Sequence, residues 1–87
     1  MYKVWSDEAW DEYLEWQDKD PDLLKRINKL LRDIERDPFG GIGKPEALKR
    51  NLQGWWSRRI DGKNRIVYRV RNNMLEIAQC GSHYGKK

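Results

Sequence analysis

Two titratable side chains, Glu46 and His83, stand among lysines and arginines in the second half of the chain. Cleavage of RNA by its own 2′-hydroxyl needs three things: a base for that hydroxyl, an acid for the departing 5′-oxygen, and cations for the charge that builds between them. A carboxylate can act as the base, and an imidazole, whose pKa is normally ~6.5, can act as the acid. These residue types are the parts that a metal-free ribonuclease requires.

Two arginines flank a turn signal, the Asp-Gly pair at residues 61–62. Arg59 precedes this turn and Arg65 follows it, so a hairpin would bring both to one face of a sheet. A guanidinium stays charged and is well shaped to bind phosphate oxygens. The alternative is that such arginines are solvated charges that protect edge strands from aggregation. This second interpretation also fits three further arginines, Arg58, Arg69 and Arg71.

Each candidate has an ordinary explanation when it is taken alone. Cations surround Glu46 in the sequence and favour the ionised carboxylate that a base requires, but an ordinary loop glutamate would show the same pattern. His83 lies near the C-terminus, where chains often fray. Tyr84 beside it has the ring to stack on a base or to pack over a strand end. No single residue therefore identifies a catalytic site.

Charge divides the chain into two unlike parts. Residues 1–37 carry 7 Lys and Arg against 11 Asp and Glu, whereas residues 38–87 carry 11 against 3, giving net charges of −4 and +8. Segregated basic charge favours contact with a polyanion such as RNA, and a solvated basic surface is the alternative. With 87 residues and 5 tryptophans, we expect one small folded domain over residues 1–87.

Several classes of protein are disfavoured by composition. One histidine and one cysteine are too few ligands for a zinc site, although a site made of carboxylates alone stays open. The glycine-rich segment 40–43 lacks the strand-to-helix context of a phosphate-binding loop. We find no signal-peptide pattern and no run of ~20 apolar residues. We therefore expect a cytoplasmic protein that has no cofactor or metal and no contact with membranes.

Helix signals follow a short predicted strand over residues 2–5. Ser6 has the side chain of an N-cap, and two acidic residues after it suit the positive end of a helix dipole. We expect this helix to end near Lys19 and a second helix to begin at Asp20-Pro21. The second helix should end at Asp37-Pro38, after apolar residues that recur at helical spacing: Leu24, Ile27, Leu31 and Ile34.

Strand signals fill the second half of the chain. We predict a glycine-rich loop over residues 39–45 and a single helical turn within residues 47–52. Three strands should follow, over residues 55–60, 65–70 and 75–80. The predicted fold is α+β, with two N-terminal helices packed on one face of an antiparallel sheet. The other face should stay partly open, with arginines at its rim.

A set of spaced motifs carries a family resemblance. They are Val4-Trp5-Ser6 with Trp10, Asp37-Pro38-Phe39, Gly43-Lys44-Pro45-Glu46, Asn51-Leu52 with Gly54, Trp56-Ser57-Arg58-Arg59-Ile60, Arg65 with Val67-Tyr68, and His83-Tyr84. Together they resemble the YoeB branch of the RelE-like bacterial toxins over nearly the whole chain. The resemblance implies a RelE-like microbial ribonuclease fold. It also implies a ribosome-dependent endoribonuclease that cuts mRNA in the ribosomal A site and inhibits translation.

The resemblance also assigns roles to individual residues. It implies that Glu46 is the general base, that His83 is the general acid and that Arg65 stabilises the transition state. Tyr84 matches the terminal aromatic residue that orients the substrate. The predicted RNA-binding and phosphate-binding cations are Lys44, Lys49 and Arg59.

The family further implies partners besides the ribosome and mRNA. One is a cognate antitoxin of the YefM type, whose flexible C-terminal part covers the basic face and displaces the active tail. A homodimer is also implied. The chain departs from the family pattern by adding Gly85-Lys86-Lys87 after the His-Tyr pair. A role for a carboxylate at the usual terminus is then in doubt, and the added lysines offer further phosphate contacts.

Two other functions compete with RNA cleavage. One is a non-enzymatic toxin of the ParE type that poisons gyrase, which would need neither Glu46 nor His83. The other is a plain RNA-binding module. Charge and spacing alone rank RNA binding above cleavage, and the family resemblance reverses that order. The candidate catalytic groups show little sign of activation in the sequence, so they would need a larger body such as the ribosome to hold the RNA in line. We therefore expect the chain to cut free RNA weakly or not at all.

Overall fold

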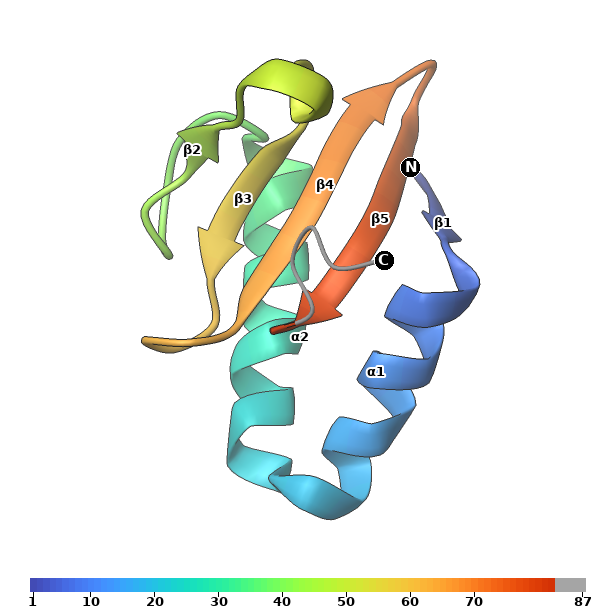
Figure 1. Ribbon diagram of the computed structural model, residues 1–87, viewed down its shortest axis with the longest axis vertical. Coiled ribbons are helices and arrows are strands. Elements are labelled where there is room, and N and C mark those ends of the chain that lie inside the picture. The colour runs from blue at the N-terminus through green and yellow to red at the C-terminus, as the bar shows by residue number, and fades with distance from the viewer. Residues whose placement is uncertain (83–87) are drawn as a thin grey trace.

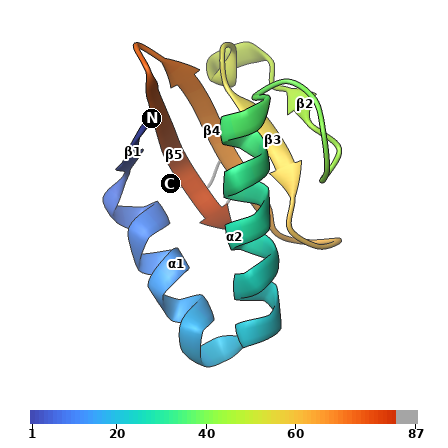
Figure 2. The ribbon, with the colours of Figure 1, turned by 180° about the vertical axis from the view of Figure 1, so that it is seen from behind.

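A computed structural model describes residues 1–82 of the chain. Two helices cover one face of a five-stranded sheet, whose strand order is β1-β5-β4-β3-β2 (Figures 1 and 2). The elements are β1 (Tyr2–Trp5), α1 (Asp7–Lys19), α2 (Pro21–Arg36), β2 (Glu46–Ala47), a short 3-10 helix η1 (Arg50–Leu52), β3 (Trp56–Arg59), β4 (Arg65–Arg71) and β5 (Met74–Gly81). The predicted α+β fold is confirmed.

One strand pair runs against the prediction of a fully antiparallel sheet. β1 pairs in parallel with β5, whereas the pairs β2–β3, β3–β4 and β4–β5 are antiparallel. The tight β4–β5 hairpin sets the direction of β5. A parallel β1 then delivers the chain into α1 on the covered face of the sheet, where its apolar side chains are buried.

Both helices begin at the predicted caps. The Ser6 hydroxyl accepts a hydrogen bond from the Ala9 amide at 3.0 Å. The Asp20 carboxylate does the same for Leu23 at 3.2 Å, with Pro21 at the first turn of α2. These caps satisfy amides that have no partner inside the helix, which stabilises each helix start by about 1 kcal/mol.

The core lies between α2 and the sheet. Four residues of α2 are buried: Ile27, Leu30, Leu31 and Ile34. They belong to one cluster with residues of β4 and β5, including Ile66, Tyr68, Leu75 and Ile77. Burying an aliphatic side chain of this size contributes about 1.5–3 kcal/mol. The apolar residues that recur at helical spacing in the sequence therefore form the face of α2 that packs on the sheet.

Side chains of α1 complete the hydrogen bonding of β5. β1 ends where Trp5 pairs with Ile77, so the last residues of β5 have no strand beside them on that edge. The Glu12 carboxylate accepts the Cys80 amide at 2.8 Å, and Trp16 Nε1 donates to the Cys80 carbonyl at 2.9 Å. These bonds fix the end of β5, from which the chain continues toward His83.

The segment 47–52 agrees with its prediction only in part. A single helical turn is present as η1, but it begins at Arg50, whose φ is +60°, whereas Glu46 and Ala47 pair with β3 as β2. The Leu48 amide continues the pairing by donating to the Trp55 carbonyl at 2.9 Å. Strand pairing thus outweighs the local helical preference. Within residues 1–82, we find no helix whose length and apolar character would let it cross a membrane.

Candidate active site

Register places Glu46 in a row of side chains on the face of the sheet opposite the helices, called here the open face, although the other three residues of the row are themselves buried. Glu46 on β2 is the partner of Ser57 on β3, which is the partner of Val67 on β4, which is the partner of Gln79 on β5. Partners directly opposite in neighbouring strands project from the same face. Glu46 therefore stands at one end of this row, and its side chain is exposed.

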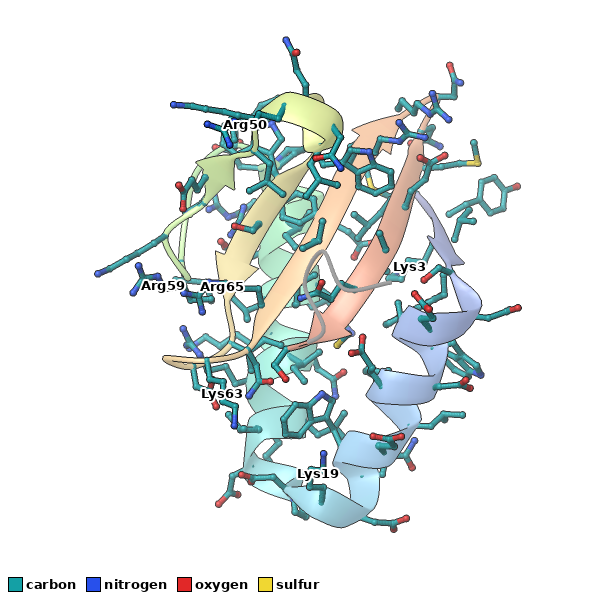
Figure 3. The ribbon with its side chains drawn as sticks, viewed as in Figure 1. Lys3, Lys19, Arg50, Arg59, Lys63 and Arg65 are labelled. Carbon is teal, nitrogen blue, oxygen red and sulfur yellow. The ribbon has the colours of Figure 1, made fainter. Side chains whose placement is uncertain are left out.

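The adjacent row brings two arginines to the same face. Arg59 is the partner of Arg65, which is the partner of Gly81 at the end of β5. Arg65 Nη1 donates to the carbonyls of Asp61 at 3.0 Å and Asn64 at 3.2 Å, so the guanidinium is held against the turn. Figure 3 shows Arg59 and Arg65 next to each other at this end of the sheet. The predicted pairing of these two arginines is confirmed.

Glu46 and Arg65 line one hollow of about 310 Å³. The other residues that line it are Leu48, Ser57 and Lys63. A carboxylate and a guanidinium thus line the same hollow on the open face. The geometry suits a bound phosphodiester, because the guanidinium can hold the phosphate while the carboxylate reaches a neighbouring hydroxyl.

The other predicted site residues lie elsewhere. Lys44 and Lys49 are exposed on the segments that flank Glu46, and neither lines the hollow as the structure describes it. His83 and Tyr84 lie outside the described residues. Sequence reasoning did not find Lys63, Ser57 or Leu48 as lining residues. Strand alternation already placed Ser57 on the face of Arg59, and this was the available signal for it.

Arg58 corrects the interpretation of this arginine as a solvated edge charge. Its side chain is fully buried, with 0% exposure. All five N–H groups of a guanidinium can be satisfied here. Nε donates to the Tyr68 hydroxyl at 3.1 Å. The two Nη atoms donate to the Asp33 carboxylate at 2.6 Å and to the carbonyls of Asp37, Gly40 and Ile42.

This arrangement fixes the loop that leads to Glu46. Asp33 Oδ2 also accepts the Ile42 amide at 2.9 Å, and the Gly43 carbonyl accepts the Arg59 amide at 2.7 Å. Hydrogen bonds from Arg36, the Ile42 amide and Arg58 hold the pKa of Asp33 well below its usual range. A charged Asp33 balances the buried guanidinium, so the loop is bound to both α2 and β3.

Two glycines let this loop approach so closely. Gly41 and Gly43 have φ values of +126° and +80°, which L side chains rarely adopt. A Cβ at Gly41 would lie 2.0 Å from Asp33 Oδ2, and one at Gly43 would lie 2.7 Å from Leu30 Cδ2. The glycine-rich segment therefore has a structural role, in which it packs closely against α2 and β3, and it does not itself form a phosphate-binding loop.

The cations at the other end of the open face are already occupied. The Arg69 guanidinium lies 4.3 Å from the centre of the Trp55 ring, and Arg69 and Arg71 both pair with Glu76. Hydrogen bonds from Arg69 and then from Arg71 lower the pKa of Glu76. Among the arginines of β3 and β4 on this face, Arg59 and Arg65 are the two that have no carboxylate partner in the described part of the chain. Within residues 1–82, no three His, Cys, Asp or Glu side chains gather in a way that could hold a metal ion.

Residues 5–84 match the sequence profile of the family described as the YoeB-like toxin of bacterial type II toxin-antitoxin systems. The chain belongs to this family. The YoeB toxin of Escherichia coli (strain K12) is 52% identical over 84 residues, which cover 97% of this chain and 100% of that protein. The predicted membership of the YoeB branch is confirmed.

Solved structures of YoeB-like toxins share the fold closely. A YoeB dimer from Staphylococcus aureus has a TM-score of 0.89 and 44% identity, covering 97% of this chain and 98% of that one. A heterotetrameric YoeB-YefM toxin-antitoxin complex from the same organism has a TM-score of 0.90 at the same identity and coverage. The predicted RelE-like architecture is therefore the architecture of this family's known members.

Proposed function

We propose that the chain is an endoribonuclease that acts in the ribosomal A site, where it cuts mRNA and stops translation. The observation that carries this proposal is that Glu46 and Arg65 face one hollow on a cationic sheet face. Membership of the YoeB-like toxins supports the same conclusion. Action on ribosomes implies a cytoplasmic location.

In the proposed reaction, Glu46 removes the proton of the RNA 2′-hydroxyl. The 2′-oxygen attacks the adjacent phosphorus, and the bond from phosphorus to the 5′-oxygen breaks. A 2′,3′-cyclic phosphate forms on one fragment, and a 5′-hydroxyl forms on the other once that oxygen has received a proton. Arg65, assisted by Arg59, stabilises the negative charge on the phosphate oxygens as it builds.

His83 supplies the proton to the departing 5′-oxygen, and Tyr84 orients the substrate. Chain length supports this assignment. β5 ends at Gly81, whose partner is Arg65, and His83 follows two residues later. Two residues span at most about 7 Å, so chain length is compatible with His83 acting at the same phosphate as Arg65. We assign Lys44 and Lys49, which are exposed near Glu46, to contacts with the RNA backbone.

The ribosome is needed because the chain alone positions RNA poorly. Each general acid or base raises the reaction rate about 10²–10⁴-fold, whereas alignment of the reacting groups lowers the activation free energy by about 7–11 kcal/mol. The hollow is open to solvent, and Glu46 is exposed. A ribosome that holds the codon in line would supply this alignment. We therefore expect little cleavage of free RNA.

Two protein partners belong to the proposal. We propose that a YefM-like antitoxin binds the chain and covers the cationic face, because a relative has been solved in such a complex. We also propose a homodimer, because a relative has been solved as one. An antitoxin placed over Arg59 and Arg65 would block RNA without changing the fold.

The test is primer extension on mRNA in translating ribosomes. The intact chain should produce new 5′ ends within A-site codons, and Glu46→Gln, Arg65→Ala and His83→Ala should each reduce cleavage at least about 100-fold. Glu15→Gln, an exposed glutamate of α1, is the matched control and should cut normally. If Glu46→Gln cuts like the parent, Glu46 is not the base. Loss of DNA supercoiling before translation would favour a gyrase poison, and binding without cut products would favour an RNA-binding module.

A further inference from the structure

The turn between β3 and β4 carries a cation that the proposed reaction does not use. Lys63 is exposed and lines the same hollow as Glu46 and Arg65. Figure 3 shows Lys63 near Arg59 and Arg65, at the end of the sheet where β3 leads into β4. The positive charge of Lys63 therefore lies at the candidate site.

Asp61 organises this turn through its carboxylate. Asp61 Oδ1 accepts the amides of Lys63 at 2.8 Å and Asn64 at 2.7 Å, and the Asn64 side chain donates to the same carboxylate. Burial alone would raise the pKa of Asp61, but hydrogen bonds from Asn64 and Lys63 outweigh burial and lower it. The carboxylate is thus engaged with the backbone of the turn and with the Asn64 side chain, and the Lys63 charge contributes a smaller attraction to it. Within the described chain, the Lys63 ammonium makes no ion pair of its own.

Only some of the N–H donors of Arg65 are free to bind the RNA phosphates. Its Nη1 is already bound to the carbonyls of Asp61 and Asn64. Glu46 adds a negative charge to the hollow that repels a phosphodiester. A further cation at the rim, besides Arg59 on the same face, offsets this repulsion. Lys63 is exposed and lines the hollow, so its ammonium can supply that charge.

We propose that Lys63 binds the RNA phosphodiester next to the one that is cut. This inference rests on the proposed function and adds a substrate contact to the same site. A lysine ammonium is a compact point charge on a flexible stem, so it fixes the path of the backbone without selecting a base. Lys63 is accordingly a binding residue that lowers KM and leaves codon choice unchanged.

The experiment compares Lys63→Gln with Lys29→Gln, which removes the same charge from α2 on the other side of the sheet. Affinity for a single-stranded RNA oligonucleotide is measured over a range of salt concentrations. The salt slope should fall by about 0.7 for Lys63→Gln and should stay unchanged for Lys29→Gln. In the ribosome assay, Lys63→Gln should raise KM roughly three- to tenfold with kcat within about twofold, and Lys63→Arg should restore KM.

Equal salt slopes and equal KM values for the two glutamine variants would overturn the assignment of Lys63. A loss of kcat at constant KM would also overturn it, because Lys63 would then act on the reaction and not on binding. If the intact chain cuts no mRNA on ribosomes, the proposed function fails instead. The salt slopes would still decide whether Lys63 contacts RNA.

Discussion

At the scale of single residues, Arg58 and Arg59 show how burial separates identical side chains. Arg58 is fully buried and binds α2 and the preceding loop, whereas Arg59 is exposed on the open face. Strand alternation sends neighbours to opposite faces, so adjacent arginines meet different surroundings. The same rule makes Arg58 a structural residue and leaves Arg59 available for phosphate.

Cys80 gives a prediction about reactivity at this scale. Burial, with a smaller contribution from the Glu12 carboxylate, raises the pKa of the Cys80 thiol to about 12. Because the thiolate is the reactive form, the folded chain should resist alkylation by iodoacetamide at mildly alkaline pH. Mass spectrometry should show complete labelling only after denaturation. Rapid labelling of the native chain would show that β5 opens at its end.

At the scale of elements, the loop before Glu46 is held by the strand that follows it. The Tyr68 hydroxyl on β4 donates to the Pro38 carbonyl at 2.6 Å and accepts from Arg58 Nε at 3.1 Å. β3 and β4 therefore set the position of a segment that lies earlier in the chain. This coupling explains how a glycine-rich loop can present Glu46 at a defined place.

Tyr68→Phe tests this coupling, with Tyr13→Phe as its matched control. Removing the Tyr68 hydroxyl leaves a buried guanidinium N–H without its acceptor, which should lower the free energy of unfolding by about 1–3 kcal/mol. The Tyr13 hydroxyl bonds Asn28 at 2.7 Å on the helix surface, and its loss should cost about 0.5–1.5 kcal/mol. Urea unfolding measures both values.

The two variants should also differ in cleavage. Tyr68→Phe should slow the proposed ribosome-dependent cleavage severalfold at a temperature where the variant stays folded, because the loop before Glu46 loses a hydrogen bond that holds it. Tyr13→Phe should cut at the parent rate. Amide hydrogen exchange at Arg59, which donates to the Gly43 carbonyl, should accelerate in Tyr68→Phe alone. Faster exchange with unchanged cleavage would show that loop order does not matter to the reaction.

At the scale of the whole molecule, the two charge regions occupy different layers. The acidic region supplies both helices and the edge strand β1, and the basic region supplies the other four strands of the sheet. Apolar side chains between them make the core. In the proposed function, this separation of charge would direct RNA to the open face and away from the helices.

The free energy of unfolding should fall in acid, because the fold lowers the pKa of carboxylates that pair with arginines. The pKa values of Asp33 and Glu76 are lowered in the fold, chiefly by Arg36 and Arg69 respectively. In the unfolded chain, such groups titrate near ~3.9 and ~4.3. Their contribution is complete above these values and is lost as the pH falls below them, because the unfolded chain then binds protons that the fold excludes.

Urea midpoints measured from about pH 7 down to about pH 3 should therefore decline from near pH 5. Glu76→Gln should make this decline shallower, because it removes one of the three carboxylates within residues 1–82 whose pKa the fold lowers, the others being Asp33 and Asp61. Glu15→Gln, which alters an exposed and weakly paired glutamate, should leave the profile unchanged. A midpoint that stays constant into acid would contradict the linkage.

Much of the secondary structure of this protein could be predicted from the sequence, because it depends on local interactions. Caps at Ser6 and Asp20, the apolar spacing of α2 and the Asp-Gly turn depend on neighbours within a few residues, so each was predictable. Pairing of Arg59 with Arg65 followed from the same short hairpin. Only tertiary structure decided that Arg58 is buried, that residues 46–47 join the sheet and that Lys63 shares a hollow with Glu46. These features depend on contacts between segments far apart in the chain: strand alternation separates Arg58 from Arg59, but it does not say which face α2 and the loop will cover.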